Sequence, residues 1–344
     1  MSLIIRPYQD GDRAAWDTYA AAHPAGTPFH LIAWQRSMQA VFGFRPCYWL
    51  AEDESGIQGI LPLFLVENFL QGRILLSSPF AVYGGILAGS DEVRQRITER
   101  VVQQGEELNV KHIELRNGHP SQCVGWERIR RYAGFKQRLE PQAAEALLAS
   151  LPKKTRNMIR KSLKSEYSVQ PAAALDQFEG LMLENYRRHG TPAFPRRHFE
   201  TIRAEFGPLV DVREILLDGR VVAASMNFLF RGEMHTYYAA SDSNYLAQAP
   251  NNFLYYDHIL WAGANGFTAF DFGRSKYGTG PYEFKRHWLT EEVELPYEIL
   301  LVRGTELPDF TPKNSKFQLA IRIWRNMPLG LTRLLGPLVV RLFP

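Results

Sequence analysis

The chain has 344 residues, of which 45% are hydrophobic and 12% aromatic, a composition that favours two packed domains and excludes a disordered chain. Forty basic residues against 36 acidic ones give a net charge of only +4, so any anion site must come from local clustering of cations. The two cysteines, Cys47 and Cys123, and the nine histidines form no CxxC, HxxxH or HExxH pair, which argues against a metal site.

Targeting segments are not evident. Met1–Arg6 lacks a signal-peptide pattern, and the longest uncharged stretch, Ile74–Ser90, is broken by serine, proline and paired glycines. It also falls short of the ~20 apolar residues that a membrane span needs. We therefore expect a cytoplasmic protein whose cysteines are reduced thiols.

The first half of the chain is predicted to begin with two helices and to continue with strands and a long helix. An acidic turn, Asp53–Gly56, separates two strands, and Ser90 is well placed to cap the helix that follows it. The expected elements are helices at 10–22 and 31–43, strands at 46–52 and 59–67, a strand and loop at 74–88, a helix at 91–108 and a strand at 111–116.

The second half repeats this order. Its expected elements are helices at 152–164 and 174–189, strands at 211–217, 221–230 and 233–241, a helix at 252–265 and a strand at 267–272. The spacing from turn to last strand is also similar, at 60 positions from Gly56 to Arg116 and 55 from Gly219 to Arg274. We predict two mixed α/β domains at 1–150 and 151–305, each a sheet covered by helices, followed by a tail at 306–344. A chance likeness between two ordinary α/β domains is the alternative.

The segment from Phe267 to Trp288 is the best candidate for a catalytic site. A strand with alternating side chains breaks at Gly273, crosses a glycine-rich loop and leads to Lys285, which is flanked by Phe284 and Trp288. A partly desolvated ammonium interacts more strongly with an anionic oxygen than a surface lysine does. The alternative is a lysine whose stem packs on the rings while its head stays in water.

Two further charged residues lie at the end of the same strand, where ligands bind in open α/β sheets. Arg274 is predicted to hold a phosphate or carboxylate, or else to pair with Asp271 or Glu283. Asp271 could accept a proton from an attacking amine, or be a buried and structurally paired aspartate. A cleft lined by Lys285, Arg274 and Tyr238 would favour an enzyme.

Several polar residues are predicted to contact a substrate, each with a structural alternative. Amide and phenol groups around the loop at 241–252 would recognise a polar acceptor, although Asn251 also suits a helix N-cap. The glycine at 84 would let backbone approach a ligand, or simply form a turn. The candidates are Arg36, Tyr83, Gly84, Tyr237, Tyr238, Asn251, Asn252 and Tyr255.

The helix at 152–164 carries six cations and no acidic residue, a pattern that favours phosphate binding over a merely solvated face. The spacing places several of them on one face, with Ile159 and Leu163 on another. The expected phosphate or RNA contacts are Lys153, Lys154, Arg156, Arg160, Lys161 and Lys164.

The tail from residue 313 to 344 also has six basic residues and no acidic one, and Pro328 and Pro337 divide it into short amphipathic pieces. At ~1 kcal/mol per basic residue near an anionic leaflet, reversible membrane attachment is the favoured interpretation. Packing of the tail on the protein's own core is the alternative.

The order of elements resembles the acyltransferase fold of the GNAT superfamily, and a tandem of two such domains is similar to the FemAB family. The motifs that carry this resemblance are Gly59–Leu63, Ser77–Gly85, the basic helix, Phe272–Ser275 and Phe284-Lys285. Shorter motifs, at 189–192, 270–275 and 312–316, resemble a FemAB-like subgroup associated with exosortase/PEP-CTERM and exopolysaccharide loci.

The resemblance implies an acyltransferase that moves an aminoacyl group from aminoacyl-tRNA to a cell-envelope precursor. It implies that Lys285 assists the transfer and contacts the acyl donor, that Phe284 of the same pair is a substrate-binding residue, and that Arg36 lies near the diphosphate of a nucleotide-linked acceptor. The chain departs from acetyl-CoA-dependent members, because the loop at 241–252 has no glycine and contains Pro250. No cofactor is implied beyond the acyl donor, either aminoacyl-tRNA or acyl-CoA.

We therefore predict an acyl or aminoacyl transferase that acts on an amine or hydroxyl of an envelope or exopolysaccharide precursor, such as a lipid- or nucleotide-linked sugar. Its expected location is the cytoplasm, peripheral on the inner face of the membrane. Two alternatives stay open: a catalytically silent adaptor at the membrane, and an acyl-CoA-dependent N-acetyltransferase.

Overall fold

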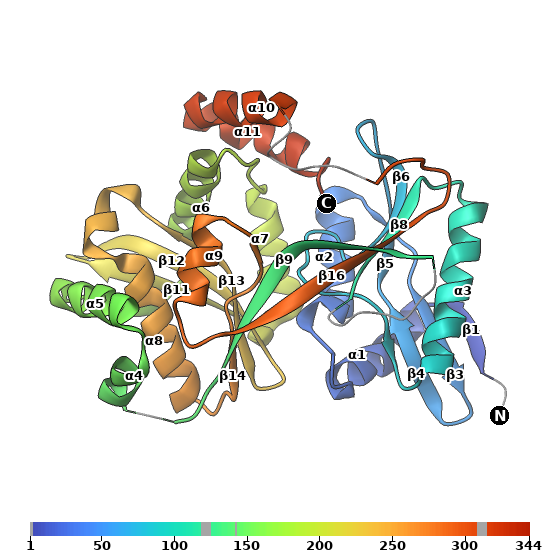
Figure 1. The fold of residues 1–344 in the computed structure, drawn as a ribbon, viewed down its shortest axis with the longest axis horizontal. Coiled ribbons are helices and arrows are strands. Elements are labelled where there is room, and N and C mark those ends of the chain that lie inside the picture. The colour runs from blue at the N-terminus through green and yellow to red at the C-terminus, as the bar shows by residue number, and fades with distance from the viewer. Residues whose placement is uncertain (1–2, 118–124, 142, 308–314) are drawn as a thin grey trace.

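The structure, a computed structural model, describes residues 3–117, 125–141, 143–307 and 315–344. Cys123, Lys313 and most of the predicted motif at 312–316 lie outside the described residues. Figure 1 shows two α/β units side by side with a helical tail along one edge. The strands form a four-stranded sheet, β1-β3-β4-β7, and a 12-stranded sheet that runs through both units.

The two units repeat the same core arrangement. In the first, β6 (Gly72–Ser77) lies parallel to β8 (His112–Arg116), and the connection between them contains α3 (Asp91–Glu107). In the second, β13 (Glu233–Ser241) lies parallel to β14 (Ala269–Asp271), and α8 (Pro250–Ala264) connects them. A hairpin precedes each pair: β3 (Trp49–Asp53) with β4 (Gly56–Leu61), and β11 (Val210–Leu217) with β12 (Arg220–Phe230). The predicted internal repeat is confirmed.

Two long strands connect the units. β9 (Glu127–Arg138) follows the first unit in the chain but pairs with β14 of the second. β16 (Glu291–Leu301) follows the second unit but pairs with β8 of the first, and β9 and β16 also pair with each other. A division of the chain at residues 150 and 305 thus gives each domain a strand whose partners among the described strands all lie in the other domain, because β9 also pairs with β15 (Ser275–Lys276).

Local predictions hold where the sequence has a clear period or cap. Ser90 Oγ accepts a hydrogen bond from Val93 N at the start of α3, as predicted. The predicted strand at 59–67 is wrong, since Pro62 separates β4 from β5 (Leu63–Asn68) and the two belong to different sheets. Proline has no N–H for a sheet ladder, so it ends one strand and frees the chain to join another sheet.

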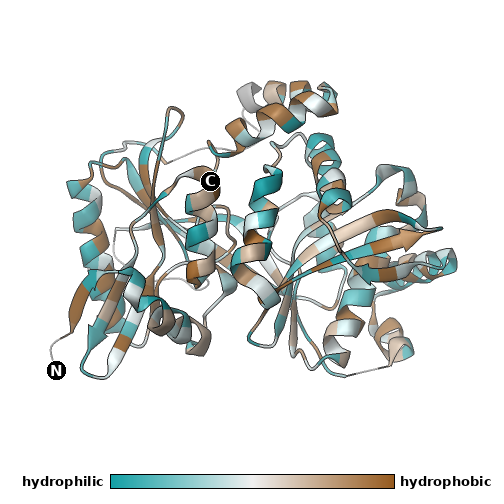
Figure 2. Ribbon diagram, turned by 180° about the vertical axis from the view of Figure 1, so that it is seen from behind, coloured by the Kyte–Doolittle hydropathy of each residue, from teal (hydrophilic) through white to brown (hydrophobic). Residues whose placement is uncertain are grey.

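Helices outside the prediction complete the layers. They are α7 (Arg196–Phe206) and α9 (Gly280–Arg286), the second within the segment expected to be loop. α7 packs against α2 (Ile32–Phe42) across the boundary between the units. There Trp34 and Phe29 of the first unit contact Phe228 of the second, with ring centroids 6.2 and 5.6 Å away. The boundary is therefore a shared aromatic core. Figure 2 shows hydrophobic segments along the strands of both units, whereas several helices alternate between hydrophobic and hydrophilic residues.

The tail forms two helices, α10 (Ser315–Asn326) and α11 (Leu329–Val340), which pack on α6 (Asp176–His189). Pro328 separates them, but Pro337 lies inside α11, so the expected break at Pro337 is wrong. Val340 is buried in the core, and Arg333 forms an ion pair with Glu179 at 3.3 Å. One side of the tail therefore packs on the protein, while five apolar side chains stay exposed: Leu319, Ile323, Leu331, Leu334 and Leu338.

Candidate active site

The site is built where the second unit's parallel strands separate. β13 pairs with β14 only from Glu233 to His235, and it then continues to Ser241 while β14 ends at Asp271. Tyr237 is an extra residue of β13 in its pairing with β12. The β-bulge that it forms changes the direction of β13 beyond the last pair of β13 with β14. The carboxyl end of β14 therefore opens onto a gap in the sheet, which is where α/β proteins bind ligands.

Lys285 lies beside this opening. It is a residue of α9 and is only partly exposed, and its Nζ donates a 3.0 Å hydrogen bond to the carbonyl oxygen of Arg274. The pKa of Lys285 is lowered to about 8, chiefly because the side chain is buried; the charge of Asp271 opposes this shift and that of Arg274 adds to it. The ammonium is thus held at the strand end with N–H groups left for an anionic oxygen.

Arg274 lies next to Lys285 and reaches across to the first unit. Its Nη1 donates to the carbonyl oxygen of Ala81 at 3.2 Å and to the hydroxyl of Tyr297, and its guanidinium lies 4.7 Å from the centre of the Tyr132 ring. The predicted alternative, a salt bridge to Asp271 or Glu283, is not formed, and Glu283 pairs with Arg286 at 3.0 Å. Among the described residues, no carboxylate lies within 4.0 Å of Lys285 or Arg274. The two cations therefore leave positive charge available for an anion.

Asp271 is 1% exposed and is bound from three directions. Its carboxylate accepts hydrogen bonds from Gly273 N at 2.6 Å and Tyr83 OH at 3.0 Å, and Lys136 Nζ lies 3.8 Å away. Burial by itself would raise its pKa, but the neighbouring positive charge and these hydrogen bonds lower it below the ordinary value. The carboxylate therefore stays ionised, which makes Asp271 a paired anion and a poor proton acceptor.

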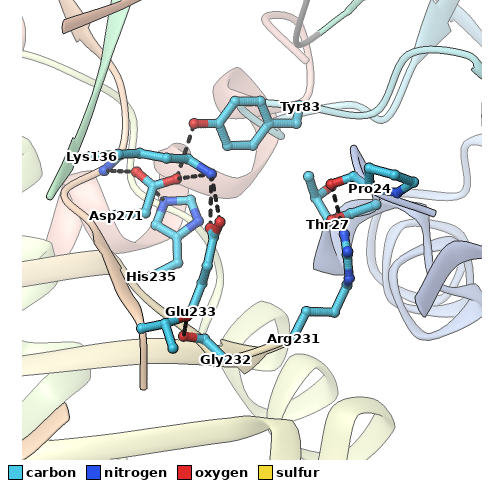
Figure 3. A network of polar contacts seen from close by, with 12 residues as sticks. Pro24, Thr27, Tyr83, Lys136, Arg231, Gly232, Glu233, His235 and Asp271 are labelled. Carbon is cyan, nitrogen blue, oxygen red and sulfur yellow. Dashed lines mark hydrogen bonds and ion pairs between the residues drawn. The ribbon is translucent and has the colours of Figure 1, made fainter. Parts of the chain in front are cut away.

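A polar cluster missed in the sequence surrounds this carboxylate (Figure 3). Lys136 pairs with Glu233 at 2.8 Å, and Nε2 of His235 lies 3.9 Å from Asp271. Tyr83, His235, Glu233 and Asp271 line a cavity of about 90 Å³ between the units, closed on the other side by residues from Pro24 to Pro28. The sequence contained one signal for this cluster. Glu233, His235 and Tyr237 alternate with other residues, a pattern that predicts three polar side chains on one face of a strand.

The predicted substrate contacts divide into separate groups. Tyr83 joins Asp271, as described above. Gly84 has φ +131°, and a methyl group there would lie 2.2 Å from Ser78 Oγ, so glycine is required for chain packing at this turn. Arg36 is exposed on α2, and no hydrogen bond or ion pair among the described residues links it to Lys285, Asp271 or Arg274.

The adjacent tyrosines of β13 belong to the joint between the units. Tyr237 donates its hydroxyl to the carbonyl oxygen of Phe80, and its ring lies 4.9 Å from that of Phe29. Tyr238 is buried, with its hydroxyl 2.8 Å from Nε2 of His198 in an aromatic cluster. Tyr238 therefore does not line the cavity with Asp271.

A second group lies around α8 and α9. Asn251 and Asn252 are in the first turn of α8, which begins at Pro250 with Ala249 as N-cap, so Asn251 is not the predicted cap. The Tyr255 ring stacks on Phe272 at 5.1 Å and lies 5.4 Å from Phe284. With Trp288, buried at 3% exposure, these rings form an apolar base next to Lys285.

The basic helix, α5 (Lys153–Ser162), packs on α8 through Thr155, Ile159 and Ser162. Leu163 follows the helix and is exposed, contrary to the expected apolar face. Arg156 donates to the carbonyl oxygen of Ala149 at 3.0 Å. The other five predicted cations are exposed: Lys153, Lys154, Arg160, Lys161 and Lys164. In the described part of the chain, none of the six lies within 4.0 Å of a carboxylate.

Comparisons with known proteins agree with this architecture. Residues 150–286 match the acetyltransferase (GNAT) domain family. No curated protein sequence matches the chain at a significant level.

Solved structures are similar over nearly the whole chain, although their sequences have diverged. FemX has a TM-score of 0.67 and 13% identity over 88% of this chain and 98% of its own. L-PGS from Bacillus licheniformis has a TM-score of 0.56 and 11% identity over 92% and 98%, and a tandem GNAT protein of the clavulanic acid pathway has 0.56 and 11% over 89% and 100%. At these identities the likeness establishes the fold alone. The protein is a tandem GNAT-fold chain whose residues 150–286 match the acetyltransferase (GNAT) domain.

Proposed function

We propose that this protein transfers an acyl or aminoacyl group from an activated donor to an amine or hydroxyl. The proposal is carried by the pair of cations at the open end of β14, Lys285 and Arg274, for which no carboxylate partner exists among the described residues. Attack on an acyl carbonyl produces a tetrahedral oxyanion, and one preorganised donor contributes about 2.7–4 kcal/mol to its stabilisation. Lys285 is the proposed hydrogen-bond donor to the oxyanion. The backbone carbonyl of Arg274 holds the Lys285 ammonium in place, and the Arg274 guanidinium adds positive charge.

The proposed donor is an aminoacyl-tRNA, with acyl-CoA as the second candidate. Thr155 Oγ1 of α5 donates to the carbonyl oxygen of His287 at 2.6 Å, so the basic helix is fixed to the end of α9 two residues from Lys285. A phosphodiester chain held by α5 would bring its acyl end toward that lysine. The loop before α8 forms the turn η5 (Ser243–Gln248), which has no glycine for a pyrophosphate cradle. The match to an acetyltransferase domain is what favours acyl-CoA.

The acceptor is proposed to be an envelope or exopolysaccharide precursor carried by a lipid or nucleotide. The resemblance of the fold to FemX and L-PGS and the short PEP-CTERM-type motifs support this class of acceptor. A catalytically silent adaptor is the competing function, and activity distinguishes the two.

The test is donor-specific transfer to hydroxylamine, a nucleophile small enough for any acyl site. Purified protein is incubated with radiolabelled aminoacyl-tRNA or with acetyl-CoA, and hydroxamate is measured after subtraction of the rate without enzyme. Product from either donor identifies the donor and supports the enzyme. Absence of product from both, by a protein that is folded, contradicts the proposed function and favours the adaptor.

Replacing Gly273 by Ala is expected to reduce turnover at least tenfold. Gly273 has φ +71°, and a methyl group there would lie 3.1 Å from His235 Nε2 and 3.8 Å from Lys285 Nζ. The methyl group would therefore occupy the space that both side chains face, and the backbone strain costs about 1–2 kcal/mol. Hydroxamate formation and thermal unfolding measure the two effects.

Gly278→Ala is the matched control for this substitution. Gly278 has φ +70° and no atom within 4 Å of the added methyl group, so it carries the same strain without the contact. Equal losses of turnover in the two variants would show that strain, and not occupied space, is responsible.

We also propose that the reaction takes place at the surface of an anionic membrane. Among the described residues, no helix combines the length and the apolarity needed to cross a bilayer. The exposed face of α10 and α11 nevertheless carries five large apolar side chains beside the exposed cations Arg322, Arg325, Arg333 and Arg341. The β5–β6 hairpin extends to the same edge of the molecule as the tail (Figure 1), and its turn contains Phe69, which is 87% exposed. In the same turn, Gln71 Nε2 donates to the carbonyl oxygen of Leu342 at 2.6 Å. Apolar insertion together with positive charge suits an anionic lipid surface.

Replacing Leu334 by Asp is expected to weaken binding to phosphatidylglycerol vesicles at least tenfold, because it removes an inserted apolar side chain and adds a repelled charge. Leu334 is 69% exposed, so the fold tolerates the change. Ile4→Asp, at a 55% exposed site of β1 (Ile4–Pro7) on another edge, should bind like wild type. Co-sedimentation measures both, and equal binding by wild type and Leu334→Asp would exclude the tail as the lipid-binding surface.

A further inference from the structure

Sheet register aligns three polar side chains from distant parts of the chain. Lys136 of β9 pairs with Asp271 of β14, and Asp271 pairs with His235 of β13. Paired residues of neighbouring strands project from the same face of a sheet. The row therefore points into the boundary between the units, toward Tyr83, and Figure 3 shows Tyr83, Lys136 and His235 gathered around the Asp271 carboxylate.

His235 is the one member of this row with an unmatched polar atom. It is 4% exposed, and its Nε2 has no hydrogen-bond partner in the part of the chain that the structure describes. The 3.9 Å separation from Asp271 is too long for a hydrogen bond. A buried polar atom left unpaired costs free energy, so it needs an explanation such as a ligand group that it meets. His235 lines the 90 Å³ cavity, which has room for a small polar group, since a water molecule takes about 30 Å³ of liquid volume.

His235, which lines the cavity, lies close to Lys285 at the end of β14. Nε2 of His235 and Nζ of Lys285 both face the side of Gly273 that lacks a Cβ, at 3.1 and 3.8 Å from the position a methyl group would take. The strand end thus brings the imidazole that lines the cavity and the ammonium of Lys285 to the same side of Gly273. A nucleophile in the cavity would approach a carbonyl carbon whose oxygen points to Lys285.

We propose that this cavity holds the attacking amino or hydroxyl group of the acceptor and that Nε2 of His235 is the base that takes its proton. The inference rests on the proposed acyl transfer. In the step, the acceptor nitrogen or oxygen bonds to the acyl carbon as its proton moves to Nε2. The bond from that carbon to the donor oxygen or sulfur then breaks, and the leaving atom takes up one proton, so that His235 returns to neutral. Asp271 is a positioning residue that stabilises the transient imidazolium.

The charges around His235 set the direction of its titration. Burial lowers the pKa of His235; Asp271 of β14 and Glu233 of β13 oppose the shift, and Lys136 of β9 and Lys285 of α9 add to it. Tyr83 and Tyr237, whose rings contact His235, keep their protons because burial raises the pKa of each above the ordinary value. The imidazole is therefore neutral and able to accept a proton at pH 7. The pH–rate profile should therefore have an acidic limb, in which the rate rises with pH, and this limb should lie below the ordinary pKa of histidine.

The test is the pH profile of hydroxamate formation by wild type and by His235→Gln, with the donor that the wild-type enzyme uses. His235→Gln should reduce kcat about 100-fold, within the range of general-base catalysis, and lose the acidic limb. A limb that belongs to hydroxylamine itself would persist in the variant, so the difference between the profiles isolates the imidazole. Asp271→Asn, which removes the charge that raises the pKa of His235, should shift the limb to lower pH.

His198→Gln is the matched control, since His198 is also buried, and its one hydrogen-bond partner among the described residues is the Tyr238 hydroxyl. It should keep the acidic limb whatever its effect on stability. A His235→Gln enzyme with the wild-type rate and the wild-type limb overturns the role of His235 and leaves acyl transfer standing. Failure of folded wild-type protein to form product from any donor overturns both proposals.

Discussion

Replacing Lys285 by Met is expected to lower turnover by about 10²–10³-fold, because the variant loses the ammonium that faces the developing oxyanion. The same substitution should leave the melting temperature unchanged or raise it. The folded protein holds this ammonium in a partly desolvated position without a carboxylate within 4.0 Å among the described residues, and methionine fills a similar volume without the charge. Loss of activity without loss of stability is the combined result to measure, by hydroxamate assay and thermal unfolding.

The pH dependence of turnover and of stability follows from the lowered pKa of Lys285. An oxyanion donor must be protonated, so wild-type turnover should fall as pH rises through about 8. Stability should change with pH in the opposite direction. Between the folded-state pKa of about 8 and the ordinary value of 10.5 the unfolded chain binds more protons, so the free energy of unfolding contributed by this group rises with pH. Lys285→Met should lack both dependences.

Arg286→Met is the matched control for Lys285→Met. Arg286 is the next cation of α9, and it is exposed and paired with Glu283 at 3.0 Å. Its replacement should change turnover less than twofold. A Lys285→Met enzyme with wild-type turnover would remove Lys285 from the mechanism, and a large loss of stability in that variant would indicate a structural lysine.

Removing three charges from α5 is expected to weaken tRNA binding strongly and to change its salt dependence. Arg160, Lys161 and Lys164 are exposed cations without carboxylate partners in the described chain, so their replacement by Gln should leave the fold intact. Each lost phosphate contact reduces the slope of log K against log salt by about 0.7–0.9, so the triple variant should lose about two units of slope. Filter binding of charged tRNA at several salt concentrations measures the slope.

A triple variant of α3, with Arg94, Arg96 and Arg100 replaced by Gln, has the same change in net charge and is the control. Arg94 and Arg100 have acidic neighbours, at 3.9 Å from Asp91 and 3.0 Å from Glu107, so this helix is a poorer phosphate site. If both triple variants lose the same slope, binding reflects net charge alone. If neither does, α5 does not contact RNA and acyl-CoA becomes the favoured donor.

The sequence by itself determined the local elements and the order in which they follow each other. The apolar periods of α3 and α8, the Ser90 cap and the turns at Gly56 and Gly219 are set by residues close together in the chain, and the repeat of the two units could be recognised from them. The position of Lys285 between the large aromatic residues Phe284 and Trp288 was likewise evident from neighbouring positions in the sequence.

Only the tertiary structure decided how the strands of the two units combine and what meets at the site. β9 pairs with β14 of the second unit and β16 pairs with β8 of the first, and the residues of β9 and β16 alone do not predict these partners. Lys136, His235 and Asp271 are brought into one row by pairing between strands far apart in the chain. A local pattern fixes which way a side chain points along its own strand, whereas cross-strand register depends on how the whole sheet packs. For that reason the imidazole of His235 near Lys285, and its row with Lys136 and Asp271, could be found only in the folded protein.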